Sequence, residues 1–94
     1  MNLYDSLEKQ FEFRINFRGK EYDVHIDRVP PREFLVYLLE PPHRRPLGWF
    51  KYTNDRWVNT LLSPKDQKII PTKNEINLIG AEIVRWHNNK GVSL

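Results

Sequence analysis

The feature that most constrains this chain is a strict alternation of apolar and polar side chains between residues 11 and 27. Every odd position in 11–17 is apolar, and after Gly19-Lys20 every even position in 22–26 is apolar. A period of two is typical of strands with one buried and one solvated face. Two such runs joined by a glycine-first turn of type II′ predict a β-hairpin in which Phe17 lies opposite Tyr22. In that register all the apolar side chains share one face of the hairpin.

The segment 33–39 (EFLVYLL) is apolar at nearly every position. A central strand covered on both faces has this composition, and so does a buried helix. Pro30-Pro31 before the segment and Pro41-Pro42 after it limit the run to the length of a strand, because proline interrupts both helices and sheet ladders. We therefore predict a central strand here.

The last part of the chain has the pattern of an amphipathic helix. Residues 72–75 (TKNE) match the capping box that begins many helices. Apolar residues then recur at helical spacing as far as Trp86, and Gly91 is placed to end the helix in a left-handed conformation. Gly80 lies within the apolar stripe, where glycine disfavours the helix, so it predicts a close approach of the helix to the sheet.

These elements predict an α+β fold, a twisted antiparallel β-sheet of four to five strands packed against one C-terminal amphipathic α-helix. Residues 47–52 and 56–60 supply the remaining hairpin, around the turn-favouring sequence Thr53-Asn54-Asp55. One helix covers one face of a sheet, so the second face of strand 33–39 needs other cover, and we expect function there. We expect one domain over residues 11–91, a flexible segment or short helix over residues 1–10, and a tail over residues 92–94.

Composition limits the classes of function. The chain has no cysteine, which excludes disulfides, thiolate catalysis and cysteine-bound zinc. Its start lacks the apolar run of a secretory signal, and no segment reaches the roughly 18 apolar residues of a membrane-spanning helix. We expect a cytoplasmic protein that does not enter a membrane. Residues 1–40 carry six Lys and Arg against eight Asp and Glu, whereas residues 41–94 carry nine against four, a net charge of +5.

The basic half contains a candidate site for an anion or a nucleic acid. His43, Arg44 and Arg45 lie between Pro41-Pro42 and Pro46, so we predict a proline-restrained loop that presents the three side chains together. A solvated loop without a ligand explains the same residues.

The second hairpin mixes aromatic and cationic residues. Trp49, Phe50, Tyr52 and Trp57 are interleaved with Lys51 and Arg56. Single-stranded nucleic acids are bound by this combination, since bases stack on the rings and cations follow the phosphates. We select Lys51 and Arg56 as nucleic-acid contacts and Phe50 and Tyr52 as partner-binding aromatics. Core packing is the alternative for most of these rings.

Two histidines are candidates for chemistry. His25 lies between Asp23 and Asp27 on the polar face of its strand, a pattern that could transfer protons or hold a metal. A solvated checkerboard of charges explains the whole face equally well. His87 lies on the apolar face of the helix, where a histidine bonded to backbone is the more frequent arrangement. Its position near the helix C-terminus favours the protonated form.

No nucleotide-binding, zinc-protease or calcium-binding motif is present in the sequence. We therefore expect a small non-catalytic binding module without a cofactor or a metal. A protein partner, a second copy of the chain and a nucleic acid all stay open as its ligand. A single-stranded nucleic-acid-binding protein is one alternative, and a small enzyme centred on His25, Asp23 and Asp27 is the other.

Overall fold

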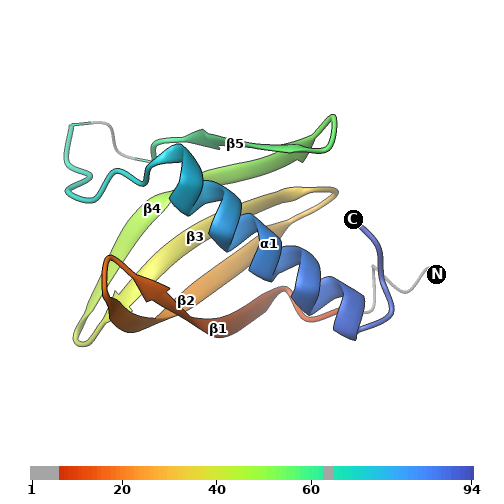
Figure 1. Ribbon diagram of the computed structural model, residues 1–94, viewed down its shortest axis with the longest axis horizontal. Helices are drawn as coiled ribbons and strands as arrows, with labels where there is room; N and C mark the ends of the chain where they lie inside the picture. The colour runs from red at the N-terminus through yellow and green to blue at the C-terminus, as the bar shows by residue number, and fades with distance from the viewer. Residues whose placement is uncertain (1–6, 63–64) are drawn as a thin grey trace.

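The protein is an α+β fold in which five antiparallel strands are followed by one helix (Figure 1). The computed structural model describes residues 7–62 and 65–94. The strands form one sheet in the order in which they occur along the chain. The expected N-terminal helical turn falls mostly on residues 1–6, outside the described part. The elements are β1 (Gln10–Phe17), β2 (Lys20–Val29), β3 (Glu33–Glu40), β4 (His43–Thr53), β5 (Arg56–Thr60) and α1 (Lys73–Asn89).

The first hairpin forms as predicted, but its register differs by two residues. Phe17 pairs with Lys20, and Ile15 pairs with Tyr22. The turn residues are Arg18 and Gly19, with φ angles of 54° and 84°. Positive φ at both positions defines a type I′ turn, whose twist matches that of the flanking strands. A shift of two residues leaves each side chain on its predicted face, so the alternation was satisfied by both registers.

Strand β3 is the central strand, as predicted, and prolines lie in the turns on both sides of it. The expected loop over residues 43–45 is wrong, because β4 begins at His43 directly after the two-residue turn Pro41-Pro42. Pro46 is tolerated inside this strand because the ladder is interrupted beside it by an irregularity between Val36 and Tyr37. A proline has no N–H to donate to a ladder, and bulges are among the places in a sheet where it is found.

Helix α1 begins and ends where the sequence indicates. The Thr72 hydroxyl accepts from the Glu75 backbone N–H, and the Glu75 carboxylate accepts from the Thr72 N–H at 2.9 Å, which completes a capping box. Gly91 follows the C-cap with φ of 79°. A Cβ on Gly80 would collide with the indole of Trp57. The close approach inferred from this glycine is confirmed.

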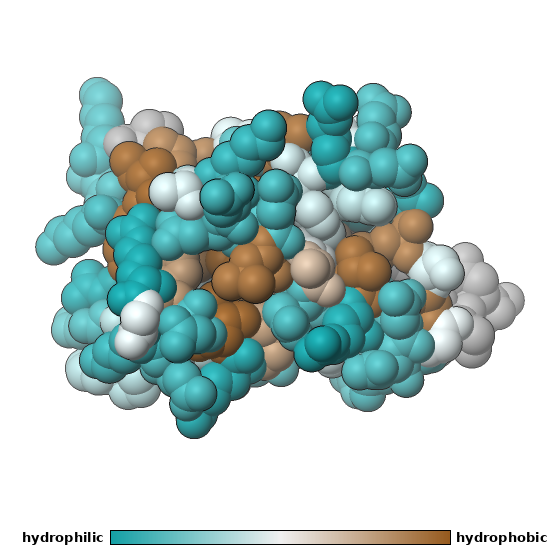
Figure 2. Space-filling model, viewed as in Figure 1, coloured by the Kyte–Doolittle hydropathy of each residue, from teal (hydrophilic) through white to brown (hydrophobic). Residues whose placement is uncertain are grey.

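The core lies between α1 and one face of the sheet. The helix crosses that face diagonally and packs on β1, β4 and β5 (Figure 1). The rings of Phe11 and Trp86 stack 3.8 Å apart at the end near the C-terminus of the helix. Most of the surface on this side is hydrophilic, with apolar residues in separate patches (Figure 2). The fully buried apolar side chains are Val24, Ile26, Phe34, Val36, Leu38, Leu47, Phe50, Ile79 and Ile83.

The connection between β5 and α1 is tied to the sheet by Gln67, whose side chain is buried. Its amide donates to the carbonyls of Leu47 at 2.9 Å and Ile69 at 2.8 Å, and its oxygen accepts from the Leu62 N–H. The Leu47 carbonyl belongs to the irregular part of β4, so a side chain from the connection replaces a partner in the ladder. No pattern in the sequence indicated this role.

Candidate interaction surface

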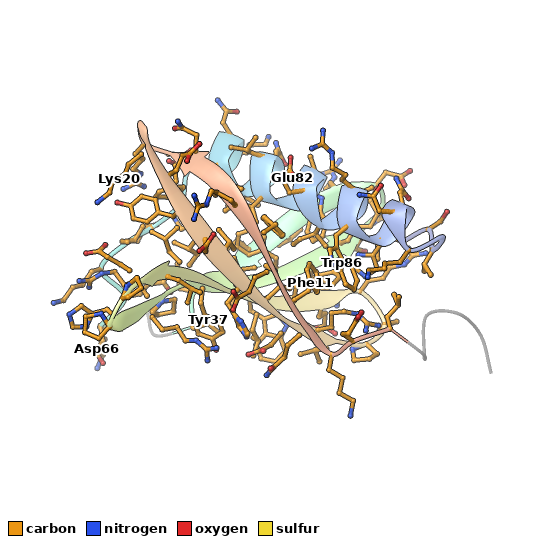
Figure 3. All side chains as sticks on the ribbon, turned by 90° about the horizontal axis from the view of Figure 1, so that it is seen from below. Phe11, Lys20, Tyr37, Asp66, Glu82 and Trp86 are labelled. Carbon is orange, nitrogen blue, oxygen red and sulfur yellow. The ribbon has the colours of Figure 1, made fainter. Side chains whose placement is uncertain are left out.

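The face of the sheet opposite α1 is the candidate functional surface, and we call it the open face. Helix α1 lies on the other side of the sheet (Figure 3), and Asp66 and Lys68 of the connection after β5 line a hollow with Arg44 and Pro46 at one end of the open face. Tyr37 projects from the sheet on the side away from the helix, whereas Phe11 and Trp86 lie on the helix side. The ladder pairings give the members of the open face: Gln10, Glu12, Arg14, Asn16, Glu21, Asp23, His25, Asp27, Val29, Glu33, Leu35, Tyr37, Leu39, Arg44, Pro46, Trp49, Lys51, Thr53, Arg56, Val58 and Thr60.

The centre of the open face is apolar. Leu35, Tyr37 and Leu39 of β3 are all partly exposed there. Trp49 on β4 pairs with Leu35 and is 38% exposed, and Val58 on β5 is 46% exposed. Four large apolar side chains are exposed in the described parts of the chain, and Trp49 and Val58 are two of them. Leu35, Tyr37 and Leu39, which alternate along β3 with buried apolar residues, therefore face the surface.

The flank formed by β1 and β2 is acidic. Glu12 and Asp27 both contact His25, with Nδ1–Oε2 and Nε2–Oδ1 distances of 2.9 Å. A ring nitrogen donates only when it carries a proton, so both contacts are hydrogen bonds at once only for the imidazolium. Asp23 does not join this group, because it accepts from Arg14 Nε at 3.1 Å. The observed register places Glu12 opposite His25, whereas the predicted pairing of Phe17 with Tyr22 would place Arg14 there.

This arrangement holds His25 in place and leaves it little access to a ligand. The His25 side chain is 8% exposed and lies between two carboxylates that occupy both ring nitrogens. A neighbouring hollow at the end of the sheet is lined by Arg14, Asp23, Leu39 and nearby residues, but not by His25. In residues 7–62 and 65–94 no group of three acidic or histidine side chains is arranged to hold a metal ion.

The flank formed by β4 and β5 is basic. The predicted nucleic-acid-binding residues of these two strands are divided between the two faces of the sheet. Arg44, Lys51 and Arg56 belong to the open face. The Arg44 guanidinium lies over the Tyr37 ring, 4.9 Å from its centroid, which places a cation against the apolar centre. His43 and Arg45 pair with Glu40 and Leu38 and point to the other face.

Three of these five side chains lie beside a second hollow at the end of the sheet, which Lys51 and Arg56 do not line. His43, Arg44 and Arg45 line it together with Lys68 and one carboxylate, that of Asp66. Arg45 is also 3.6 Å from a Glu40 carboxylate oxygen. Two of the five charged or titratable groups around the hollow are thus engaged, Arg44 by a ring and Arg45 by a carboxylate. The strand supplies their spacing, and the proline-restrained loop that we expected does not exist.

The two predicted partner-binding aromatics have other roles. Phe50 is fully buried in the core and cannot contact a partner. Tyr52 is partly exposed and packs on Trp57, with ring centroids 4.9 Å apart, on the helix side of the sheet. The exposed aromatic of this hairpin is Trp49. The alternation of the strand separates Trp49 from Phe50, but the sequence did not show which of the two sets faces the helix.

His87 is a core residue. It is fully buried, and its Nδ1–H donates to the Ile83 carbonyl at 2.8 Å. Burial lowers the pKa of His87; its hydrogen bond to Ile83 opposes this and the positive charge of Arg28 adds to it. We expected the helix C-terminus to favour the protonated form, but the loss of hydration outweighs that effect.

The chain matches no protein-family model, no curated protein and no solved structure. Among the described residues no helix has the length and apolar character needed to cross a membrane.

Proposed function

We propose that this chain is a small non-catalytic module that binds another protein through its open face. The observation that carries the proposal is a set of exposed apolar side chains on the open face, which lie on β3 and, as Trp49 and Val58, among the cations of β4 and β5, with the carboxylates of β1 and β2 on the other flank. Apolar patches with a charged rim are characteristic of protein-binding surfaces, and tryptophan is enriched at their centres. A suitable partner has an apolar centre of its own and charges complementary to the two flanks.

Two alternatives receive less support from the same face. A nucleic acid would gain from Arg44, Lys51 and Arg56, but the carboxylates of β1 and β2 repel phosphates over the other half of the face. An enzyme centred on His25 needs a substrate within reach of the ring, and the ring is buried between Glu12 and Asp27.

A photo-cross-linking amino acid tests the proposal in the host cells of the protein. Benzoylphenylalanine placed at Trp49, and separately at Val58, should form adducts with a protein. Arg85 is the matched control position, because its side chain is 72% exposed on α1 and lies away from the open face. Adducts from positions 49 and 58 and not from 85 support the proposal. Adducts that nuclease removes, or adducts equally frequent at all three positions, overturn it, and so does the absence of adducts at 49 and 58.

A further inference from the structure

The hollow beside the start of β4 is lined by cations from two separate parts of the chain. Arg44 and Arg45 come from the first residues of β4, and Lys68 comes from the connection between β5 and α1. Strand β5 pairs with β4 from Trp49 onward, and the connection takes the place beside the earlier residues of β4. The hollow lies between the start of β4 and this connection. Its volume is about 180 Å³, which is room for several water molecules.

The buried side chain of Gln67 fixes one wall of the hollow. It makes three hydrogen bonds to backbone groups, at distances of 2.8, 2.9 and 3.1 Å. Its two neighbours in the chain, Asp66 and Lys68, are exposed and line the hollow. Because the residue between them is fixed, these two side chains start from a set position, and a ligand loses less conformational entropy when it binds there.

The charges around the hollow favour an anion that carries more than one negative charge. The lining has three permanent cations, one histidine and one carboxylate, so its net charge is +2 with the histidine neutral. Glu40 offsets part of this charge, since a carboxylate oxygen lies 3.6 Å from Arg45 Nε. A phosphate monoester carries about −1.5 to −2 at neutral pH and accepts hydrogen bonds on three oxygens. The guanidinium group of arginine binds such oxygens in pairs. The members of the lining are His43, Arg44, Arg45, Pro46, Asp66 and Lys68.

The spacing of the cations on the open face favours a single phosphate over a strand of nucleic acid. Arg44 and Lys51 both lie on the open face of β4, but they are seven residues apart, which is roughly 23 Å along a strand. The exposed ring of Trp49 lies between them, and neither Lys51 nor Arg56 lines the hollow. A nucleic-acid strand is bound by cations that follow its backbone. Here three cations gather at one point instead.

The hollow is continuous with the apolar side chains of β3. Arg44 and Pro46 belong to both the hollow and the open face, and they pair with Leu39 and Tyr37. The Arg44 guanidinium also lies over the Tyr37 ring. A phosphate in the hollow therefore places the molecule that carries it beside Leu39 and Tyr37. A free phosphate ion makes no use of these apolar side chains, whereas a phosphorylated segment of a protein does.

We propose that the hollow binds the phosphate of a phosphorylated side chain in the protein that occupies the open face. Recognition of phosphorylated segments by clustered arginines is a recurring mode of peptide binding. The inference rests on the proposed function, because it requires a protein on the open face. It adds the chemical class of the partner and the position of its phosphate.

Inorganic phosphate tests the hollow in the isolated full chain. Phosphate is exchanged for chloride at constant ionic strength, and the amide resonances are followed by NMR. Those of residues 43–45 and 66–68 should shift and saturate together. Lys68→Gln should raise the dissociation constant about threefold, because it removes an attractive charge, and Asp66→Asn should lower it about threefold, because it removes a repulsive one.

Arg85→Gln is the matched control for these variants. It removes the same positive charge from a side chain that is 72% exposed on α1, and it should leave the dissociation constant unchanged. Opposite effects of the changes at Lys68 and Asp66, with none at Arg85, support the inference. Shifts spread over the whole surface, or an equal effect of Lys68→Gln and Arg85→Gln, overturn it.

A single-stranded oligonucleotide separates one phosphate from a row of phosphates. It should bind no more tightly per phosphate than the inorganic ion, and Lys51→Gln should not affect its binding, because Lys51 lies outside the hollow. An oligonucleotide that binds more tightly, and that Lys51→Gln weakens as much as Lys68→Gln does, uses the cations along the strand. That result overturns the inference in favour of a nucleic acid.

Phosphatase tests the partner and separates the two proposals. In an extract of the host cells, the adducts formed by benzoylphenylalanine at Trp49 should disappear when the extract is treated with phosphatase before irradiation. Lys68→Gln should reduce them, although Lys68 lies outside the strands of the open face. Adducts that persist after both changes overturn the inference and leave the proposed function standing. The absence of adducts at positions 49 and 58 overturns both proposals, even if inorganic phosphate binds in the hollow.

Discussion

Arg18, in the turn between β1 and β2, donates two hydrogen bonds to the carboxylate of Glu75 in the first turn of α1. The distances are 3.0 Å from Nε to Oε2 and 3.1 Å from Nη2 to Oε1. The same carboxylate accepts the N-cap hydrogen bond from Thr72, and Arg18 also donates to the carbonyl of Ile70. One side chain therefore fixes the start of the helix against a turn that lies 57 residues earlier in the chain.

Removing the charge of Glu75 should weaken the fold at neutral pH but not in acid. The hydrogen bonds from Arg18 are the main cause that holds the pKa of Glu75 below its ordinary value of 4.5, and those from Thr72 add to it. A carboxyl with a lowered folded-state pKa stabilises the fold above its ordinary pKa, and this contribution is lost as the pH falls below 4.5. We expect Glu75→Gln to reduce the free energy of unfolding by about 1 kcal/mol at pH 7, a modest figure because Arg18 is half exposed.

Urea unfolding at several pH values measures this effect. The difference between Glu75→Gln and the unchanged chain should shrink as the pH falls below 4.5. Glu82→Gln is the control, since Glu82 only approaches Arg85 within the helix, at 3.6 Å, and its loss should cost no more than about 0.5 kcal/mol. An equal effect of both substitutions would show that the link to the turn is unimportant.

Gly80→Ala should destabilise the protein although alanine favours helices. Alanine gains about 1 kcal/mol over glycine inside a helix. Here its Cβ meets the indole of Trp57, and relief of such overpacking costs typically about 1–3 kcal/mol. We expect a lower melting temperature for Gly80→Ala and a higher one for Asn77→Ala, an exposed position of the same helix.

Shortening Trp57 tests the cause of that effect. In Trp57→Leu the added methyl has room, so Gly80→Ala should be neutral or stabilising in this background. A Gly80→Ala variant that is as stable as the unchanged chain would show that the strand adapts to the methyl group. Thermal unfolding followed by circular dichroism measures the stability of the unchanged chain, of Gly80→Ala, of Trp57→Leu and of the variant with both changes.

Buried His87 should make stability depend on pH in a range different from that of Glu75. Its folded-state pKa is lowered from 6.5, mainly by burial, so the unfolded chain binds a proton more readily than the folded one. Stability is therefore complete above pH 6.5 and falls as the pH decreases below it. His87→Phe, which keeps an aromatic ring beside Phe11 and Phe34, should reduce this decrease between pH 6.5 and 5.

His25 and His43 are present in both chains of that comparison, so the difference between the two pH profiles belongs to His87. Proton titration by NMR gives the same answer independently. An unchanged stability profile in His87→Phe would mean that other groups cause the acid sensitivity. A resonance of His87 that titrates at or above 6.5 would contradict the effect of burial.

The sequence predicted the faces of the first hairpin but not its register, because two registers that differ by two residues place the same side chains in the core. It missed the first residues of β4, where Pro46 concealed a strand that tolerates proline beside an irregularity. The candidate surface was harder to predict. Leu35, Tyr37 and Leu39 are apolar like the buried residues between them, and only the position of the helix decides which set is exposed. Phe50 was assigned to the wrong set for this reason.

The order of the strands has a consequence for how the chain folds. Each strand pairs with the strand before it, and the connections from β1 to β5 are turns of two or three residues. The loop-closure entropy of the sheet is therefore small, and contacts of this kind favour fast folding. Docking of α1 is different, because contact with β1 closes a loop of more than fifty residues. The sheet can thus assemble hairpin by hairpin, while the core is completed only when the end of the chain returns to its beginning.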